Sequence, residues 1–342
     1  MTQFDLNCPV PANQSDHVTM AHGGGGKMMN QLIQNLFQSK LSNSHLDQLH
    51  DGAIIDLGDK KLAFSTDSFV INPIFFPGGD IGSLAVHGAV NDVAMCGAIP
   101  KYLSLAFILE EGFPMADLER IVNSVKIASA QADVEVVTGD TKVVDKGKGD
   151  GIYIITAGIG EVMPGVDIRP ENVKPGDAVI VSGDIGRHAI AIMAVREGLE
   201  FSTKIESDSM AVNHQVKSII DKGIYPHCLR DCTRGGLASA LVEISQSAQV
   251  HIQIEEEKIP VLNEVKGACE ILGFDPIYLA NEGRFISFIK DDNIESVLKV
   301  IPDAVHIGNV LESGQAKVTM KQPFGPAKIV DMLSGEQLPR IC

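Results

Sequence analysis

Residues 81–100 read IGSLAVHGAVNDVAMCGAIP, an apolar stretch in which Asp92 is the only charged side chain. The stretch predicts an apolar helix over 81–97 and its exit. A lone buried carboxylate costs several kcal/mol unless it is paired or coordinates a cation. Asp92 is therefore a candidate cation ligand. The residues leave one alternative open, in which its carboxylate caps a neighbouring loop through hydrogen bonds.

Two further aspartates follow predicted strands on either side of this helix. Asp67 lies where the strand 62–65 of a predicted β-hairpin ends, and Asp140 follows a strand over 134–138. Carboxylates at strand ends can converge on one crevice, where oxygen ligands suit Mg²⁺ and Lys142 would add a positive charge for phosphate. Each aspartate alone is equally well explained as a turn former. It is the convergence of the three that indicates a Mg²⁺–nucleotide site.

The remaining elements alternate between helix and strand in both halves of the chain. Residues 164–175 contain three prolines among polar residues, which marks a domain boundary. We expect further strands at 102–109, 152–159, 178–182, 250–254, 285–289 and 304–311, and helices at 114–131, 185–198, 209–222 and 235–248. This pattern indicates an α+β protein with two mixed domains.

Four successive glycines precede a helix expected over 28–37. The stretch is His22, Gly23, Gly24, Gly25, Gly26 and Lys27. Backbone N–H groups in such a run can wrap an anion. It is not a Walker A loop, because Met28 follows the lysine and Ala21 stands where the first glycine is required. The residues alone fit a phosphate cradle and an unliganded flexible loop equally well.

Two polar motifs lie in the second half. Residues 230–236, RDCTRGG, precede a helix, where Thr233 would be the N-cap and Arg234 with the helix N-terminus would favour an anion. A capped helix with a salt bridge explains the same residues. Residues 281–283, NEG, precede a strand; turn chemistry accounts for the asparagine and the glycine but does not require Glu282.

Composition excludes several classes of protein. The 342 residues include 44 acidic and 28 basic side chains, a net charge of −16, without a basic patch that would attract nucleic acid. The first 17 residues lack the basic and apolar regions of a signal peptide, and no aliphatic stretch approaches the ~20 residues that span a bilayer. The six cysteines show no paired spacing, which is typical of a reduced protein. We therefore expect a cytoplasmic protein that binds neither nucleic acid nor membrane.

The last residue is a cysteine, Cys342, at the end of a stretch over 333–342 that has no periodicity and that we expect to be a mobile tail. A thiol at such a tip can visit more than one site, and sulfur is both a good nucleophile and a good leaving group. The residues alone favour an inert exposed thiol. The other five cysteines are expected to be packing residues, although Cys228 and Cys232 would also suit a metal pair on a helix.

Seven stretches of the chain together resemble a known family. They are residues 22–26, FSTD at 64–67, VHGAVND at 86–92, TGDTK at 138–142, DCTRGG at 231–236, ANEG at 280–283 and PRIC at 339–342. Over essentially its whole length the chain is similar to the HypE family, the hydrogenase-maturation carbamoyl dehydratases of the aminoimidazole ribonucleotide synthetase-like (PurM-like) superfamily. The aspartate motifs belong to the superfamily, whereas the Pro-Arg-Ile-Cys ending singles out HypE. Cys232 stands at a variable position of its motif.

The resemblance implies an α+β fold of two PurM-like α/β domains with a flexible C-terminal tail. We expect an N-terminal arm, glycine-rich loop and helix over 1–44, an ATP-binding and dimerisation domain over 45–165, a second α/β domain over 170–332 and the tail over 333–342. The first domain would pair with its twin in a homodimer. The second would close the nucleotide cleft.

The resemblance also implies a reaction. A carbamoyltransferase, HypF, loads a carbamoyl group onto Cys342; ATP activates the carbamoyl oxygen, and departure of phosphate leaves a thiocyanate. The cyanide then passes to iron on a HypC–HypD scaffold complex and becomes a ligand of NiFe hydrogenase. Under the resemblance Cys342 is thus the reactive thiol rather than an inert one.

The matched positions carry roles in that reaction. The implied Mg²⁺ ligands are Asp67, Asp92, Asp140 and Asp231, and the same residues with His22, Gly23, Gly24, Gly25, Gly26, Lys142 and Arg234 would bind ATP. Lys142 would also act on the phosphates during catalysis. Glu282 is the expected general base near the carbamoyl nitrogen, because a carboxylate bound to Mg²⁺ would be too weak a base.

Two other functions compete with this one. The first is a small-molecule kinase or ligase of the same superfamily, for which the last residues would be dispensable. The second is a scaffold protein that binds nucleotide without turnover.

Overall fold

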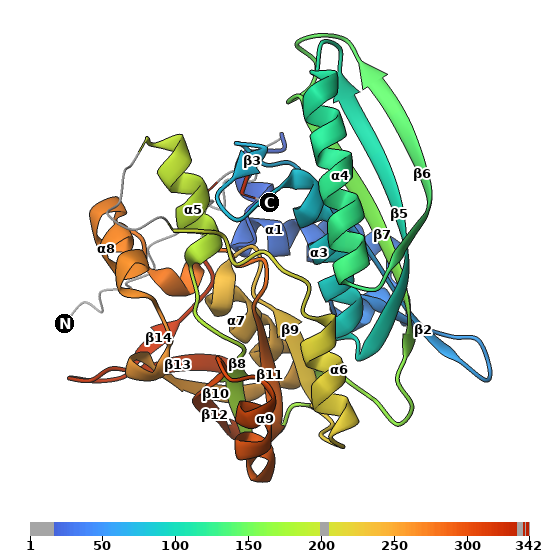
Figure 1. The fold of residues 1–342 in the computed structure, drawn as a ribbon. Helices are drawn as coiled ribbons and strands as arrows, with labels where there is room; N and C mark the ends of the chain where they lie inside the picture. The colour runs from blue at the N-terminus through green and yellow to red at the C-terminus, as the bar shows by residue number, and fades with distance from the viewer. Residues whose placement is uncertain (1–16, 199–204, 334–337, 339, 342) are drawn as a thin grey trace, which may run out of the picture.

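The computed structural model describes residues 17–198, 205–333, 338, 340 and 341 (Figure 1). These residues form a five-stranded sheet, a seven-stranded sheet and a two-stranded hairpin of β3 (Phe75–Phe76) and β4 (Gly79–Asp80). Cys342, the candidate reactive thiol, lies outside the described residues.

The first sheet has the order β1–β2–β7–β5–β6. Its strands are β1 (Ala53–Asp56), β2 (Lys61–Phe69), β5 (Ala98–Glu110), β6 (Glu135–Val144) and β7 (Ile152–Val162). Neighbours pair antiparallel except β5 and β6, which are parallel and are joined through helix α4 (Met115–Gln131). The expected hairpin before the apolar helix is confirmed as β1 and β2.

The apolar helix predicted from residues 81–97 is α3 (Ile81–Met95). It begins at Asp80, whose carboxylate accepts hydrogen bonds from the backbone N–H groups of Gly82 (2.8 Å) and Ser83 (3.0 Å). With α4 it covers one face of the first sheet. The packing is close, because a Cβ added to Gly158 of β7 would lie 2.9 Å from Val93.

The opposite face of the first sheet carries exposed apolar side chains. Phe64 of β2 pairs with Ile159 of β7, which pairs with Tyr102 of β5, so the three form one row across the sheet. Their exposed fractions are 39%, 38% and 48%. Side chains in register on neighbouring strands share a face, so this row is a continuous apolar surface within one chain.

The second sheet has the order β14–β13–β10–β12–β8–β11–β9. Its strands are β8 (Asp177–Val181), β9 (Cys228–Asp231), β10 (Val250–Glu255), β11 (Phe285–Lys290), β12 (Val305–Ser313), β13 (Lys317–Lys321) and β14 (Lys328–Val330). Strand β8 is buried on both faces: Val179 and Val181 pack with α7 (Gly236–Ala248), while Ala178 and Ile180 pack with α6 (Asn213–Asp221) and α9 (Ile294–Val300). Helices α5 (Arg187–Arg196) and α8 (Asn263–Leu272) pack toward α3 instead.

The N-terminal segment is helical where a helix was expected. A short turn η1 (Met20–Gly23) leads through the glycine run into α1 (Lys27–Leu32), the π-helical stretch η2 (Ile33–Gln38) and α2 (Ser39–Leu41). Further single turns are η3 (Leu46–Gln48), η4 (Pro170–Asn172), η5 (Glu256–Lys258), η6 (Pro276–Tyr278) and η7 (Asp291–Asn293). Among the helices that the structure describes, none is long and apolar enough to span a bilayer.

Several predicted boundaries are wrong, and each has a physical reason. Asp67 and Asp140 do not follow strands but lie inside β2 and β6, because pairing with β7 and β5 continues past them. The helix expected over 209–222 begins only at Asn213, since the polar segment before it bonds to other elements. The N-cap of α7 is Gly235, with a φ of 80°, rather than Thr233.

The described residues of the stretch expected to be a mobile tail are packed against the rest of the chain. Ile341 is 4% exposed and packs in the same core cluster as α3 and α5, with Leu338 beside it. Burial of these two apolar side chains and hydrogen bonds to the backbone of 340 and 341 explain the docking.

Candidate active site

Three carboxylates converge where α3 faces the first sheet and β9. Ser65 of β2 donates a 2.5 Å hydrogen bond to Oδ2 of Asp92. Asp67 lies two residues further along β2, on the same face, and a Cβ on Gly88 would come 3.2 Å from its Oδ2. Gly88 and Asp92 are one turn apart on α3, so both carboxylates lie along one helix face. Asp231, at the end of β9, completes the group.

The pKa values of all three carboxylates are raised above their usual values. Burial raises the pKa of Asp92 well above its usual value, and the negative charges of Asp231, Asp67 and Asp51 raise it further. Burial likewise raises the pKa of Asp231, with Asp51 and Asp67 adding to it. The pKa of Asp67 is raised by burial and lowered by the nearby charge of Arg234. A cluster of carboxylates that resist ionisation together is suited to a cation.

Glu282 belongs to the same cluster. It is 2% exposed, and its Oε1 has no hydrogen-bond partner among the described residues. Burial, followed by the charges of Asp231, Asp67 and Asp208, raises its pKa well above the usual value, whereas Arg234 acts in the opposite direction. The sequence singled out Glu282 because turn chemistry did not require a carboxylate there. In the structure this residue is buried within the cluster.

The glycine run lies against the start of α7. Gly25 has a φ of 72°, and a Cβ there would come 2.6 Å from the carbonyl carbon of Arg234. The Gly25 carbonyl oxygen accepts a 3.0 Å hydrogen bond from Ser239 Oγ. His22 is fixed by Thr19, whose backbone N–H donates to His22 Nδ1 at 3.0 Å. The tight contact leaves no room for a side chain on Gly25.

A cavity of about 350 Å³ separates the glycine run from the tail. Its lining includes His22, the four glycines, Ser68, Arg234, Leu338, Arg340 and Ile341. Ser68 is the neighbour of Asp67, and Arg234 is the cation that acts on both Asp67 and Glu282. The cavity is thus bounded by the glycine run, by a cation near the carboxylates, and by residues 338, 340 and 341 of the tail.

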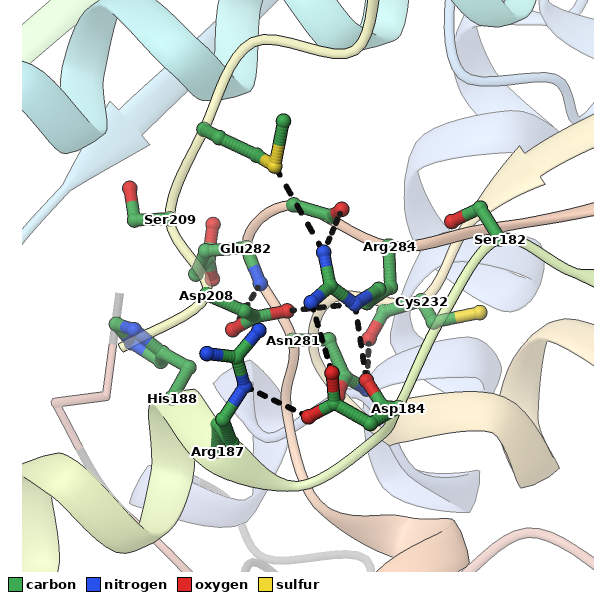
Figure 2. A network of polar contacts seen from close by, with 12 residues as sticks. Ser182, Asp184, Arg187, His188, Asp208, Ser209, Cys232, Asn281, Glu282 and Arg284 are labelled. Carbon is green, nitrogen blue, oxygen red and sulfur yellow. Dashed lines mark hydrogen bonds and ion pairs between the residues drawn. The ribbon is translucent and has the colours of Figure 1, made fainter. Parts of the chain in front are cut away.

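A buried polar network supports Glu282 from the second domain (Figure 2). Arg284, 7% exposed, donates to Asp184 Oδ1 at 2.9 Å and lies 4.0 Å from Asp208 Oδ2. Asp208 Oδ1 accepts the backbone N–H of Glu282 at 3.3 Å. Asn281 Oδ1 accepts the N–H of Gly186 at 2.7 Å. Asn281 is therefore a buried clamp between α5 and the loop of Glu282, not only a turn residue.

Sequence reasoning missed Asp51, Asp184, Asp208 and Arg284. Asp51 accepts a 2.5 Å hydrogen bond from Arg230, and its charge raises the pKa values of Asp92 and Asp231. The acidic and serine residues at 206–209 could have indicated Asp208, but the helix predicted over 209–222 overlaps the end of this run.

Asp140 and Lys142 are not brought to the cluster within this chain. Both lie on the edge strand β6, with side chains 63% and 69% exposed, and they pair with each other at 3.1 Å. The hydrogen bond from Lys142 lowers the pKa of Asp140, the opposite direction to the pKa shifts of Asp67, Asp92 and Asp231.

The cysteines of the described chain are packing residues, as expected. Cys96, Cys228, Cys232 and Cys269 are buried and free, and burial raises the pKa of each thiol. Cys228 lies on β9 rather than on a helix, which removes the metal-pair alternative. Cys8 and Cys342 lie outside the described residues.

The donor set fits a divalent cation that is shared with phosphates. Among the described residues, no group of three His, Cys, Asp or Glu side chains is arranged to ligate one ion. Mg²⁺ usually takes only one or two carboxylates and completes its shell with water and phosphate oxygens. Burial raises the pKa values of Asp67, Asp92 and Asp231, and neighbouring carboxylates raise those of Asp92 and Asp231 further. Oε1 of Glu282 has no partner among the described residues. A bound cation would stabilise the ionised form of these groups.

Comparison with known proteins gives the family. A model described as AIR synthase related protein, N-terminal domain, matches residues 49–162, and one described as the C-terminal domain matches residues 174–321. Carbamoyl dehydratase HypE of Azotobacter vinelandii is 49% identical over 348 residues, which cover 100% of both chains. The chain belongs to the HypE family. It is therefore a carbamoyl dehydratase of hydrogenase maturation, and its fold is the α+β arrangement of two AIR synthase-type domains.

Solved HypE structures share the whole architecture. A crystal structure of HypE in complex with ATP has a TM-score of 0.81 and 43% identity, covering 95% of this chain and 100% of that one. A HypE–HypF complex has a TM-score of 0.83 and 44% identity, covering 88% of this chain and 99% of that one. Membership of HypE sets aside the kinase, ligase and scaffold alternatives.

Proposed function

We propose that this chain uses ATP and Mg²⁺ to dehydrate a carbamoyl group carried on its own C-terminal cysteine, Cys342. The product is a thiocyanate that supplies a cyanide ligand for the iron of NiFe hydrogenase. One observation carries the proposal: Ile341, the residue before Cys342, lines the same cavity as the glycine run and Arg234. The substrate thiol is thus joined directly to a wall of the expected nucleotide site.

The proposed reaction consumes one ATP for each carbamoyl group. The carbamoyl oxygen attacks the γ-phosphorus of ATP and ADP leaves; the C–O bond then breaks, phosphate departs with that oxygen, and the nitrogen loses both protons. One thiocyanate, ADP and phosphate result. The bonds that break need a stabilised leaving group and a base. The glycine run and Arg234 line the cavity and would stabilise the phosphate. The buried Glu282 carboxylate, whose pKa burial raises and the charge of Arg234 lowers, would be the base.

The residues of this chain have distinct tasks in that scheme. The backbone of His22–Gly26 and the Arg234 guanidinium would hold the phosphates. Of Asp67, Asp92 and Asp231, one or two carboxylates would ligate Mg²⁺ directly and the others would balance its charge, and the ion would neutralise charge on the phosphates. Glu282 would take a proton from the carbamoyl nitrogen, because its burial gives an ionised carboxylate high basicity.

Asp140 and Lys142 remain proposed members of the site, as groups that act in the assembled homodimer. The support is the apolar row Phe64–Ile159–Tyr102 on the open face of the same sheet. A second copy packed on this face would cover that row. The Asp140 carboxylate pairs with Lys142 within the chain, so this ion pair would have to open for Asp140 to bind a metal.

The domains and partners follow from the same proposal. We assign 1–44 to the N-terminal arm, loop and helix, 45–165 to the ATP-binding and dimerisation domain, 170–332 to the second domain and 333–342 to the tail. The matched ranges 49–162 and 174–321 support this division. The loading partner would be HypF, with which a relative was crystallised, and the acceptor of cyanide a HypC–HypD complex.

Intact mass spectrometry tests the proposal. With HypF, carbamoyl phosphate and ATP, the chain should gain a carbamoyl mass at Cys342 and then lose one water. Cys342→Ala should show neither change, while still binding ATP. ATP-dependent cyanide formation by Cys342→Ala would overturn the proposal.

A further inference from the structure

The end of the chain is bound by a buried histidine of α5. His188 is 0% exposed, and its Nε2 lies 2.7 Å from the carbonyl oxygen of Ile341, across 153 residues of sequence. Its Nδ1 lies 2.8 Å from Ser207 Oγ. Both ring nitrogens are therefore engaged, one by the tail and one by a fixed hydroxyl.

The hydrogen-bond partners determine which nitrogen carries the proton. A carbonyl oxygen can only accept, so Nε2 must donate to Ile341. In the neutral ring Nδ1 then accepts from the Ser207 hydroxyl. Ser207 Oγ in turn accepts the backbone N–H of Ser209 at 3.0 Å, which leaves its proton for His188. Burial lowers the pKa of His188 and keeps the ring neutral at physiological pH.

The ring is also held in place by packing and the tail by further bonds. Phe76 meets the His188 ring edge-on, with centroids 5.5 Å apart and planes at 89°. The Arg340 carbonyl oxygen accepts the backbone N–H of Asn72 at 3.3 Å and a further hydrogen bond from the Arg196 guanidinium. Successive carbonyls of the tail are thus bound by donors from different elements.

The seat of the tail is continuous with the loop of Glu282. Residues 207–210 run from His188 to that loop: Asp208 accepts the N–H of Glu282, and the Met210 N–H donates to the Glu282 carbonyl at 3.4 Å. Figure 2 shows Asp208 and Ser209 of this segment together with His188 and Glu282. One short segment therefore fixes both the histidine that holds the tail and the backbone of the candidate base.

We propose that His188 is the positioning residue that seats the C-terminal tail for dehydration, by donating from Nε2 to the Ile341 carbonyl, with Ser207 fixing the donor tautomer. The inference rests on the proposed function and deepens it. The fixed carbonyl belongs to Ile341, which lines the cavity and directly precedes Cys342 in the sequence. His188 is not among the residues that line the cavity of the glycine run and Arg234, so its effect would be on the population of the seated tail.

Two substitutions at His188 distinguish its hydrogen bond to the Ile341 carbonyl from the packing of its ring. His188→Gln keeps an N–H donor near the position of Nε2, whereas His188→Leu keeps bulk and removes the donor. For Leu we expect dehydration of the preloaded carbamoyl chain, followed by mass spectrometry in single turnover, to slow at least about tenfold, the equivalent of one 1.4 kcal/mol step. Gln should recover most of that rate. Loading by HypF should not slow in either variant, and ATP affinity should stay within about twofold of wild type for both.

A second readout follows the tail itself. Alkylation of Cys342 by iodoacetamide, quantified on the C-terminal peptide, should be faster in His188→Leu than in wild type and return toward wild type in His188→Gln. The matched control is His214→Leu, at an exposed histidine of α6 that donates to Gln131 outside the cavity. If His188 only stabilised the fold, His188→Leu would lower the unfolding midpoint and would not slow dehydration selectively while sparing the loading step.

Each outcome decides the inference. If His188→Leu dehydrates at the wild-type rate, or if Gln and Leu lose activity equally with native unfolding midpoints, His188 does not seat the tail. If wild type itself loads but never loses water, the proposed function fails instead. If His188→Leu does not fold, Ser207→Ala replaces it, and unchanged dehydration and Cys342 alkylation in that variant overturn the inference.

Discussion

Ser65 and Asp92 are 27 residues apart in the sequence and are joined by a 2.5 Å hydrogen bond from the Ser65 hydroxyl to Asp92 Oδ2. The bond ties β2 to α3 at the point where the carboxylates converge. A neutral donor satisfies one oxygen but does not neutralise the charge. The folded chain thus holds, beside Asp67 and Asp231, a carboxylate whose pKa is raised because its ionised form is disfavoured there.

The first prediction concerns that charge. Asp92→Asn keeps an oxygen that accepts from Ser65 and removes the repulsion. In EDTA at pH 7 we expect the free energy of unfolding to rise by about 1–2 kcal/mol, because Asp92 must either bury its charge or take up a proton on folding and asparagine does neither. The affinity for Mg²⁺–ATP should fall at least tenfold, measured by calorimetry.

Asp59→Asn, in the exposed turn between β1 and β2, is the matched control and should change neither quantity. Unchanged Mg²⁺–ATP affinity in Asp92→Asn would remove Asp92 from the cation site.

The second prediction concerns Glu282 as the base. Glu282→Gln preserves size and removes the proton acceptor. We expect ATP binding and carbamoyl loading to persist within a few-fold, while dehydration of loaded Cys342 slows by roughly 10²–10⁴-fold, the usual range for loss of a general base. Single-turnover mass spectrometry separates the two steps. Glu270→Gln on the exposed side of α8 serves as the control, and dehydration at the wild-type rate by Glu282→Gln would assign the base elsewhere.

The site residues that could be predicted from sequence are those that their immediate sequence neighbours do not explain. Asp92 was visible because a lone charge in an apolar helix is expensive, and Glu282 because turn chemistry did not need it. The extents of β2 and β6 were not visible, since strand length depends on pairing with distant partners. Asp140 was therefore predicted at a strand end, where its carboxylate could converge with the others on one crevice. It lies instead inside an exposed edge strand.

The residues that were missed act only through distant contacts. His188 lies in an apolar helix and meets Ile341 across 153 positions, a separation no periodicity reports. Asp208 lies in a segment without regular structure whose hydrogen bonds go to the Glu282 loop. A docked tail could not be inferred either, because its few apolar side chains are attractive only to a core that the rest of the chain builds.

The third prediction concerns the glycine run. Gly25→Ala places a Cβ 2.6 Å from the Arg234 backbone at a φ of 72°, so the run and Arg234 must separate. A left-handed conformation alone costs about 1–2 kcal/mol for a non-glycine residue. We expect ATP affinity to fall at least tenfold by equilibrium dialysis. Gly223→Ala has a similar φ of 75° with no atom within 4 Å, so it carries the backbone strain without the crowding; an equal loss of affinity in both variants would refute the crowding argument.

The fourth prediction concerns the open face of the first sheet. Ile159 is the middle residue of the apolar row with Phe64 and Tyr102. Ile159→Asp would bury a carboxylate in the proposed homodimer, which should raise the dimer dissociation constant at least about 100-fold and leave monomers in sedimentation velocity. Ile271→Asp on α8, at a side chain that is 71% exposed, introduces the same charge elsewhere. A persistent Ile159→Asp dimer would place the interface on another surface.

The last prediction concerns acid sensitivity through His87 of α3. Its ring is buried, with Nδ1 3.0 Å from Ser209 Oγ, and burial lowers its pKa to about 4. The unfolded chain, with a pKa near 6.5, binds the proton first, so this contribution to stability is present above about pH 6.5 and is lost as the pH falls toward 4. Between pH 7 and pH 5 the loss amounts to about 2 kcal/mol. His87→Asn cannot titrate, so its free energy of unfolding in urea should fall by about 2 kcal/mol less than that of wild type over this interval, whereas His214→Asn should follow wild type. Parallel pH profiles for His87→Asn and wild type would show that the buried ring is not the group whose protonation destabilises the fold.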